Sequence, residues 1–485
     1  MNIYSLRWLL LPLVAVWLFE TGRKVGHPFE VFTVLMLTVL SLGLLLTQMG
    51  RPLYDTLWVW SILFVFLAGY FFKSYWISNH LLDTSKLLYV GNVRWVTEEI
   101  IERGLHPTTA AFVTFCVTSW AVLAVTPPRS TPWVGVAMTD DIALRRYRRM
   151  VSWVLILAMV SIVTAIVQAR LGIGIMGVDT ARLPFRLDTL LFRTRSDVIP
   201  SLALLLIWVS DRPRMRNLWA ASVLMLFLHW MVSGLLTTSR GATVEFLAPV
   251  MFLWFLTGKF RRSRKAIVIG AMLIAALLHP IVSHLRMERM QHSDGIMVAL
   301  NKTLALWKWD TGTRSSVEAF TLMALRVTGS DSVWYAQEAV PTENSVARVR
   351  SILVNLPQYF TKNVVGLKIP ADFWAPGLVG AFLVLGGQIG VVVFMVFYVL
   401  AVGKAWRWLS MFQAGPVVLS VFAYYILILS SGGEFYFPEV VGLSITILVC
   451  ETAYKNWLLP VGTEWIAQRM PAPAMAPFVP QRQLR

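Results

Sequence analysis

The sequence predicts an all-α polytopic membrane protein, and three observations support this fold class. Of its 485 residues, 57% are hydrophobic and only 14% are charged, whereas soluble domains average about 25% charged residues. Apolar runs of roughly 17 to 25 residues recur along the chain, and each is long enough to cross a hydrocarbon core of about 30 Å. Basic residues gather in the short connections between these runs, so the net charge of +17 indicates membrane topology and excludes nucleic acid as the expected partner.

The apolar runs predict about 12 transmembrane helices. The sixth and eleventh of these runs are the shortest. The first run lacks a small-residue cleavage site, so we expect it to be a retained helix and not a signal peptide. The predicted spans cover residues 3–19, 29–48, 56–77, 109–126, 150–168, 198–210, 218–236, 242–258, 266–284, 376–401, 416–431 and 440–457.

The orientation follows from the three densest basic clusters, at residues 145–149, 212–216 and 259–265. All three fall on the same side of the predicted bundle. Because cytoplasmic loops are enriched in Lys and Arg, both termini are predicted to be cytoplasmic. The longer polar segments, 78–108, 169–197 and above all 285–375, then lie outside.

The chain divides into four regions on this topology. Residues 1–284 carry the first nine spans with small outer loops, and residues 376–457 carry the last three. The long loop at 285–375 is expected to form a cap of short helices, because loops of this length usually carry function. Residues 458–485 are expected to be a disordered cytoplasmic tail. Within the cap, helical spacing predicts short helices at 295–309, 315–327 and 345–356.

A second set of arginines lies on the predicted outer side, against the orientation rule. The planar guanidinium of arginine binds phosphate in a bidentate manner and stays charged when partly desolvated. We therefore predict that this set binds a lipid-linked pyrophosphate. Ordinary ion pairing is the alternative, for example Arg186 with Asp188, Arg240 with Glu245, or Arg289 with Glu288 or Asp294. The candidates for diphosphate binding within this set are Arg186, Arg193, Arg195, Arg240, Arg289 and Arg326.

The sequence predicts neither a metal nor a cofactor. It contains no Gly-rich loop of the G-x-x-x-x-G-K-[ST] type and no dense carboxylate cluster that would hold a divalent cation. Its two cysteines, Cys116 and Cys450, fall inside apolar segments and are expected to be small core residues.

Three segments carry a resemblance to a known family. Residues 235–242, Leu-Leu-Thr-Thr-Ser-Arg-Gly-Ala, resemble a T-x-S-R-G/T-A signature between adjacent spans, and residues 326–331 resemble an R-x-x-G-x-D element in the large loop. Residues 375–390, rich in glycine, resemble the point where that loop re-enters the membrane. Together, over roughly residues 150–440, the chain resembles bacterial oligosaccharide repeat-unit polymerases, the Wzy-like family. The related O-antigen ligases share the Ser-Arg element, but their histidine motif in the large loop is not found here.

The resemblance implies a GT-C-like bundle with metal- and nucleotide-independent glycosyltransferase activity at the periplasmic face of the bacterial inner membrane. An undecaprenyl-pyrophosphate-linked oligosaccharide would be transferred onto a hydroxyl of the next lipid-linked repeat unit. The resemblance leaves open whether the product is O-antigen of lipopolysaccharide, capsule or exopolysaccharide. The implied partners are the lipid bilayer and a chain-length regulator, that is, a polysaccharide co-polymerase.

Such a transfer requires stabilisation of the leaving diphosphate and a base for the acceptor hydroxyl. Arg240 and Arg326 are the first choices for binding the diphosphate, with Arg186, Arg193, Arg195 and Arg289 as further candidates. Two alternatives remain, an O-antigen ligase and a non-catalytic flippase or exporter of lipid-linked glycans. The candidates for the base are Asp331, Glu434, Glu318 and His292.

Overall fold

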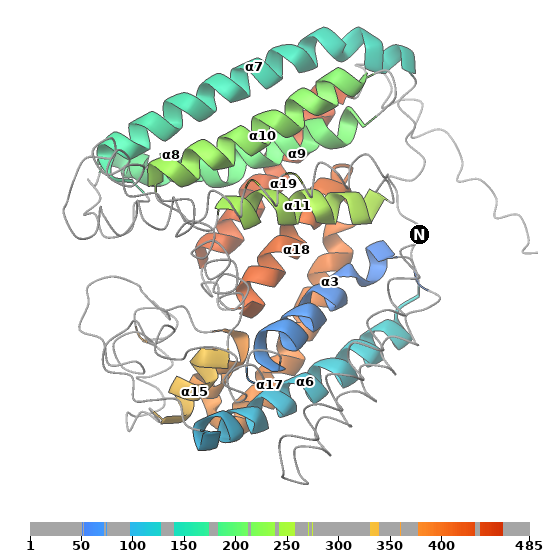
Figure 1. Cartoon of the computed structure of the whole chain (residues 1–485). Coiled ribbons are helices and arrows are strands. Elements are labelled where there is room, and N and C mark those ends of the chain that lie inside the picture. Colours follow the sequence, from blue (N-terminus) through green and yellow to red (C-terminus); the bar gives the residue numbers. More distant parts are fainter. Residues whose placement is uncertain are drawn as a thin grey trace, which may run out of the picture.

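A computed structural model of the protein describes much of the predicted bundle (Figure 1). All regular secondary structure in the described residues is helical, which confirms the all-α class for this part of the chain. The predicted spans at 3–19 and 29–48, and that at 266–284 except for residues 270 and 274, lie outside it. The described residues are 51, 53–71, 74, 98–127, 140–173, 183–211, 215–237, 242–257, 270, 274, 330–338, 359, 377–431 and 437–458.

Five stretches of described helix are long and apolar enough to cross a membrane, so this is a multi-pass membrane protein. Two shorter apolar helices, Leu247–Thr257 and Gly415–Leu427, accompany them. The total of about 12 spans stays a prediction. The five candidate spans are Tyr54–Phe71, Arg103–Val125, Tyr147–Leu171, Arg216–Leu235 and Leu378–Leu409.

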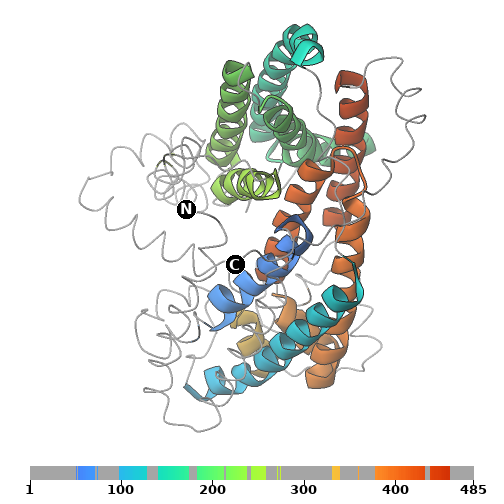
Figure 2. The same cartoon turned by 90° about the vertical axis from the view of Figure 1, so that its right-hand side faces the viewer.

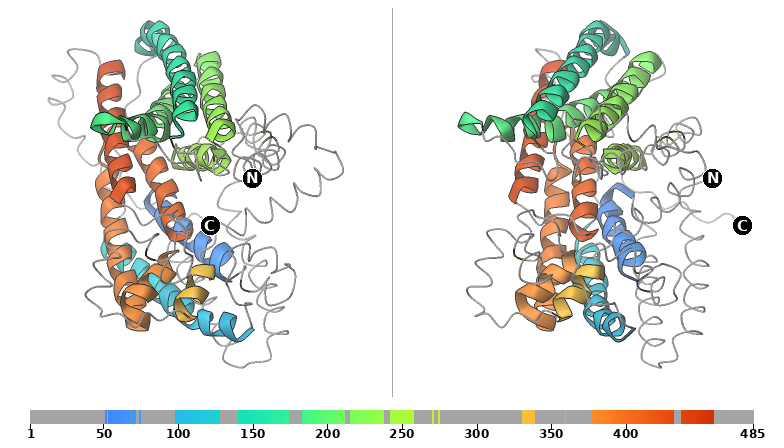
Figure 3. Two further views of the ribbon diagram at one scale, coloured as in Figure 1. Left: turned by 90° about the vertical axis from the view of Figure 1, so that its left-hand side faces the viewer. Right: turned by 60° about the vertical axis from the view of Figure 1, so that its left-hand side comes forward.

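The helices form two groups joined by a third. In Figure 1, α7 to α10 lie in the upper part, and α3, α6 and α15 lie in the lower part. The orange and red helices α17 to α19 link the two groups. In Figure 2 and in the left panel of Figure 3, α17 and α19 lie along one side of the molecule, with α18 nearer the middle. The elements are α3 (Leu53–Phe64), η1 (Val65–Phe71), α6 (Glu98–Val125), α7 (Asp140–Leu171), η3 (Pro184–Arg186), α8 (Leu187–Arg193), η4 (Thr194–Val198), α9 (Ile199–Val209), α10 (Arg216–Thr237), α11 (Ala242–Thr257), α15 (Ser330–Glu338), α17 (Leu378–Leu409), α18 (Gly415–Ser431) and α19 (Phe437–Leu458).

Helix α18 occupies the centre of the bundle. It packs against α3, α9, α11, α17 and α19, and residues 414–426 are all buried. Helix α9 is similarly enclosed, since Trp208 is its only residue that is not fully buried. A helix that is apolar all round is expected inside a bundle. These two helices match the two shortest predicted spans, at 198–210 and 416–431, and they face other helices rather than lipid.

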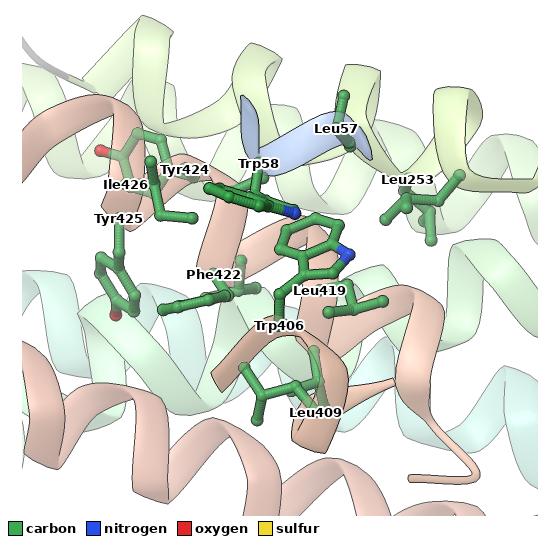
Figure 4. Packing of buried hydrophobic residues seen from close by; sticks show 14 of the residues in the cluster. Leu57, Trp58, Leu253, Trp406, Leu409, Leu419, Phe422, Tyr424, Tyr425 and Ile426 are labelled. Carbon is green, nitrogen blue, oxygen red and sulfur yellow. The ribbon is translucent and has the colours of Figure 1, made fainter. Parts of the chain in front are cut away.

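Two tryptophans hold the junction of four helices (Figure 4). Trp58 of α3 and Trp406 of α17 are 2% and 1% exposed, and they pack beside Leu253 of α11 and Phe422 of α18. The rings of Trp406 and Phe422 lie 6.1 Å apart. Trp406 Nε1 also donates to the carbonyl oxygen of Tyr54 at 2.8 Å, so the indole N–H is satisfied inside the apolar core.

One short helix of the predicted cap packs onto the bundle. Helix α15 contacts α6 and α17. A Cβ added at Gly104 of α6 would collide with Trp334, and one added at Gly380 of α17 would collide with Ser332. Ser332 Oγ also accepts a hydrogen bond from the Gly377 N–H at 3.0 Å. The three cap helices expected from the sequence lie outside the described residues, and α15 is an additional one.

Helix α17 is broken near the end that adjoins α15. Gly387 has φ +63° and ψ −157°, a conformation that only glycine adopts readily. A Cβ at Gly390 would lie 3.1 Å from the carbonyl oxygen of Phe382, so the two parts of the helix approach closely at the bend. Residues 386–389 are exposed there. The glycine-rich segment that resembles a membrane re-entry point therefore forms a kink.

Candidate functional site

A continuous helical run from α8 through η4 to α9 carries the charged residues of the candidate site. The predicted span began at residue 198, after the charges, whereas the structure continues the helix through them. Arg193, Arg195 and Asp197 are only 9%, 6% and 3% exposed. These two arginines, expected in an outer loop, therefore lie in the packed bundle, and this corrects the predicted position. The segment η4 is a π-helical turn, a feature often found at functional sites.

Asp197 joins the arginine helix to the centre of the bundle. Its Oδ2 accepts from Arg193 Nη1 at 2.9 Å, and its Oδ1 accepts from the Tyr425 hydroxyl at 3.0 Å. Tyr425 belongs to α18 and borders the apolar cluster of Figure 4. Both carboxylate oxygens are therefore bound, which offsets part of the cost of burying this charge.

Helix α19 approaches this pair through a glycine. A Cβ added at Gly442 would lie 2.9 Å from Arg193 Nη1, 2.9 Å from the Tyr425 hydroxyl and 3.1 Å from Asp197 Oδ1. One turn along α19, Thr446 Oγ1 lies 3.0 Å from Ser201 Oγ of α9. Small residues at four-residue spacing let helices pack closely in a membrane. The ion pair therefore fits only because residue 442 has no side chain.

The second arginine of the run shares an aromatic neighbour with the first. The guanidinium carbons of Arg195 and Arg193 lie 5.4 Å and 5.7 Å from the ring centre of Phe192, within cation–π range. The Arg195 carbonyl oxygen accepts from His229 Nε2 at 3.0 Å. Gln168 Nε2 donates to the carbonyl oxygen of Leu191 at 2.6 Å. Side chains from α7 and α10 therefore fix the backbone on both sides of the arginines.

The chemistry of this cluster favours an anion. Among the described residues, Arg193, Arg195 and Asp197 are the buried charged side chains, so the formal charge is +2 − 1 = +1. Ionisable residues inside a membrane bundle are costly and usually functional. Guanidinium groups suit phosphate oxygens because their N–H donors are arranged in a planar fork.

The other predicted site residues are placed only in part. Arg186 ends η3, the short turn that directly precedes α8, and Asp331 is the second residue of α15. Helices α8 and α15 lie at the same end of the bundle, on the left in Figure 1, with α18 between them. The remaining candidates lie outside the described residues: Arg240, Arg289, Arg326, His292, Glu318 and Glu434.

The sequence did not point to four residues of this cluster. Asp197 stands four residues after Arg193, a spacing that signals an ion pair on a helix. Tyr425, His229 and Gly442 lie inside apolar runs and give no such signal. Only the packing of α10, α18 and α19 brings them to η4.

No protein-family model matches this chain. Comparisons with curated proteins and with solved structures likewise find no match. Within the described parts of the chain, no three His, Cys, Asp or Glu side chains gather where they could hold a metal ion. The function is therefore inferred from the residues of the cluster and from the sequence motifs.

Proposed function

We propose that the protein is an integral-membrane glycosyltransferase that polymerises undecaprenyl-pyrophosphate-linked oligosaccharide repeat units at the periplasmic face of the bacterial inner membrane. The observation that supports this proposal is the pair Arg193 and Arg195, buried on one helix at one end of the bundle. A diphosphate at the end of a membrane-embedded lipid is an anion that such a pair suits.

The position of the pair along the membrane normal supports the same ligand. Helix α7 begins beside the basic cluster at 145–149, and α9 ends beside the cluster at 212–216. Because both clusters are predicted to be cytoplasmic, the connection from α7 to α8 lies at the opposite, outer end. Arg193 is the last residue of α8, the short helix that follows this connection, and Arg195 lies two residues further on. The diphosphate of a lipid in the outer leaflet lies at this level.

The proposed reaction needs no nucleotide, because the donor glycan already carries a diphosphate leaving group. The bond between its anomeric carbon and the diphosphate oxygen breaks, and the acceptor hydroxyl oxygen bonds to that carbon. The hydroxyl proton passes to a base, and undecaprenyl pyrophosphate leaves. Positive charge near the leaving oxygens stabilises the transition state. In this proposal Asp331, Glu434, Glu318 and His292 remain candidates for the base.

The arginines have distinct parts in this proposal. Asp197 and Tyr425 hold Arg193 in a fixed direction, so little reorganisation is needed when the donor binds. Arg195 lies two residues further along the π-helical turn and contributes a second guanidinium. Four arginines complete the proposed diphosphate site from other segments: Arg186, Arg240, Arg289 and Arg326.

The test uses the purified protein in nanodiscs with a synthetic undecaprenyl-pyrophosphate repeat unit and neither metal nor nucleotide. Products are resolved by length. Wild type should form a ladder, Arg195→Lys should lose at least about tenfold in rate because the bidentate fork is lost, and Arg195→Ala should lose more. Arg148→Ala is the matched control, since Arg148 is exposed at the opposite end of the bundle.

The outcomes separate the proposal from its alternatives. A glycan that appears only on an added lipid A–core acceptor would identify a ligase. If no product forms while vesicles containing the protein move the same lipid across the bilayer, the protein is an exporter and the proposal is wrong.

A further inference from the structure

A proline follows the π-helical turn η4 and removes one backbone donor from the helix. The Ile199 N–H donates to the Thr194 carbonyl, five residues earlier. The next bond in this pattern would join residue 200 to the carbonyl of Arg195. Residue 200 is proline, which has no N–H to donate. Residue 200 therefore cannot donate to the Arg195 carbonyl, and this carbonyl accepts a hydrogen bond from another element.

His229 of α10 supplies that hydrogen bond. Its Nε2 lies 3.0 Å from the Arg195 carbonyl oxygen. Because a carbonyl oxygen can only accept, Nε2 must carry the proton. Nδ1 of the same ring lies 2.7 Å from Ser161 Oγ of α7, and in the neutral ring it accepts from the serine hydroxyl. His229 and Ser161 are 2% and 4% exposed.

The ring of His229 is also held in orientation by its surroundings. The indole of Trp230 lies edge-to-face with it, with ring centres 5.2 Å apart. Helices α7 and α10 pack against each other, and α7 also contacts η4. The hydrogen bonds therefore form a chain from Ser161 through His229 to the Arg195 backbone, across three packed elements.

We infer that His229 is a positioning residue that fixes the direction of the Arg195 side chain. By binding the Arg195 carbonyl, it stabilises the π-helical turn, and the Ser161 hydroxyl, which donates to Nδ1, holds the ring in place. If the turn reverted to an α-helical pattern, the residues before it would rotate by about 100° around the helix axis relative to those after it, which would redirect the arginine. This inference rests on the proposed function in so far as Arg195 binds the diphosphate of the donor.

Two substitutions of His229 separate its two hydrogen bonds. In His229→Gln, the side-chain amide reaches the place of Nε2 and can still donate to the Arg195 carbonyl. In His229→Asn, the amide reaches only the place of Nδ1, so the contact with Ser161 is kept and the contact with Arg195 is lost. We expect His229→Asn to lower the polymerisation rate by about tenfold to a hundredfold, and His229→Gln to stay within about threefold of wild type.

A backbone measurement tests the hydrogen bond itself, independently of activity. Amide hydrogen exchange of peptides covering residues 194–201 should be faster in His229→Asn than in wild type, and near wild type in His229→Gln. A wild type that forms no ladder would overturn the proposed function, while this comparison would still decide whether His229 holds the carbonyl. Equal exchange in all three proteins would overturn the inference.

A double substitution distinguishes positioning from general stability. If His229 acts through Arg195, then His229→Asn should cost much less in rate in an Arg195→Lys background, where the planar fork is already absent. Costs that multiply fully in the double variant, with unchanged melting temperatures, would show that His229 does not act through Arg195. Equal rates for His229→Asn and wild type would also overturn the inference.

Discussion

Arg193 and Asp197 form a buried ion pair within a single helix, with Nη1 and Oδ2 2.9 Å apart and side chains that are 10% and 3% exposed. The pair spans the π-helical turn and is completed by the Tyr425 hydroxyl from α18. A charge at this depth is tolerated because its partner lies one turn away on the same helix. The ion pair and the tyrosine thus couple the arginine helix to the core.

Removing the carboxylate should destabilise the bundle. Asp197→Ala leaves the buried Arg193 without its carboxylate, and breaking a buried ion pair lowers the free energy of unfolding by about 3–5 kcal/mol. We expect a clearly lower melting temperature in nanodiscs. The double variant Arg193→Met with Asp197→Leu should be more stable than Asp197→Ala, since it removes both charges. A melting temperature of Asp197→Ala equal to that of wild type would contradict the role of the pair.

The Tyr425 hydroxyl should contribute to stability through its hydrogen bond to Asp197. Tyr425→Phe keeps the ring and removes one hydrogen bond to a charged group, at a cost of about 1.5–3 kcal/mol. The measurement is urea or thermal unfolding of wild type and variant. In the Asp197→Leu background the same substitution should cost less, because the hydrogen bond to Asp197 is already absent. An equal cost in both backgrounds would place the effect of the hydroxyl elsewhere.

Gly442 should not tolerate even a methyl group. In Gly442→Ala the new Cβ would lie 2.9 Å from both Arg193 Nη1 and the Tyr425 hydroxyl, closer than real Cβ contacts. We expect a loss of about 1–3 kcal/mol in stability together with reduced polymerisation. Gly270→Ala is the matched control, because a Cβ there meets none of the described residues within 4 Å. Wild-type behaviour of Gly442→Ala would show that α19 can shift away.

The packing of α15 against α6 and α17 should depend on two small residues. Gly104→Ala drives a Cβ into the Trp334 indole, and Gly380→Ala drives one into Ser332. Either change should expose α15 to faster amide hydrogen exchange and to protease, while the α7–α10 group stays protected. Gly270→Ala again serves as the control. Protection of α15 that equals wild type in both variants would mean that this helix adapts to the added methyl groups.

The sequence determined the class of this protein and the place of most described helices. Apolar runs long enough to cross a bilayer predicted helices where α6, α7, α10 and α17 lie. The same reasoning singled out Arg193 and Arg195 as functional candidates, because outward basic residues run against the orientation rule. These conclusions can be drawn from the sequence because each depends only on residues that are close together along the chain.

Tertiary structure decided how the charged segment is used. The sequence predicted that the sixth span begins at residue 198, just after Asp197, because charges within a span are costly. The structure continues the helix, because Tyr425, 228 residues away in the chain, completes the hydrogen bonding of Asp197 and Gly442 leaves room for it. The cost of burying a charge depends on the partners that packing supplies, and no local pattern in the sequence contains them.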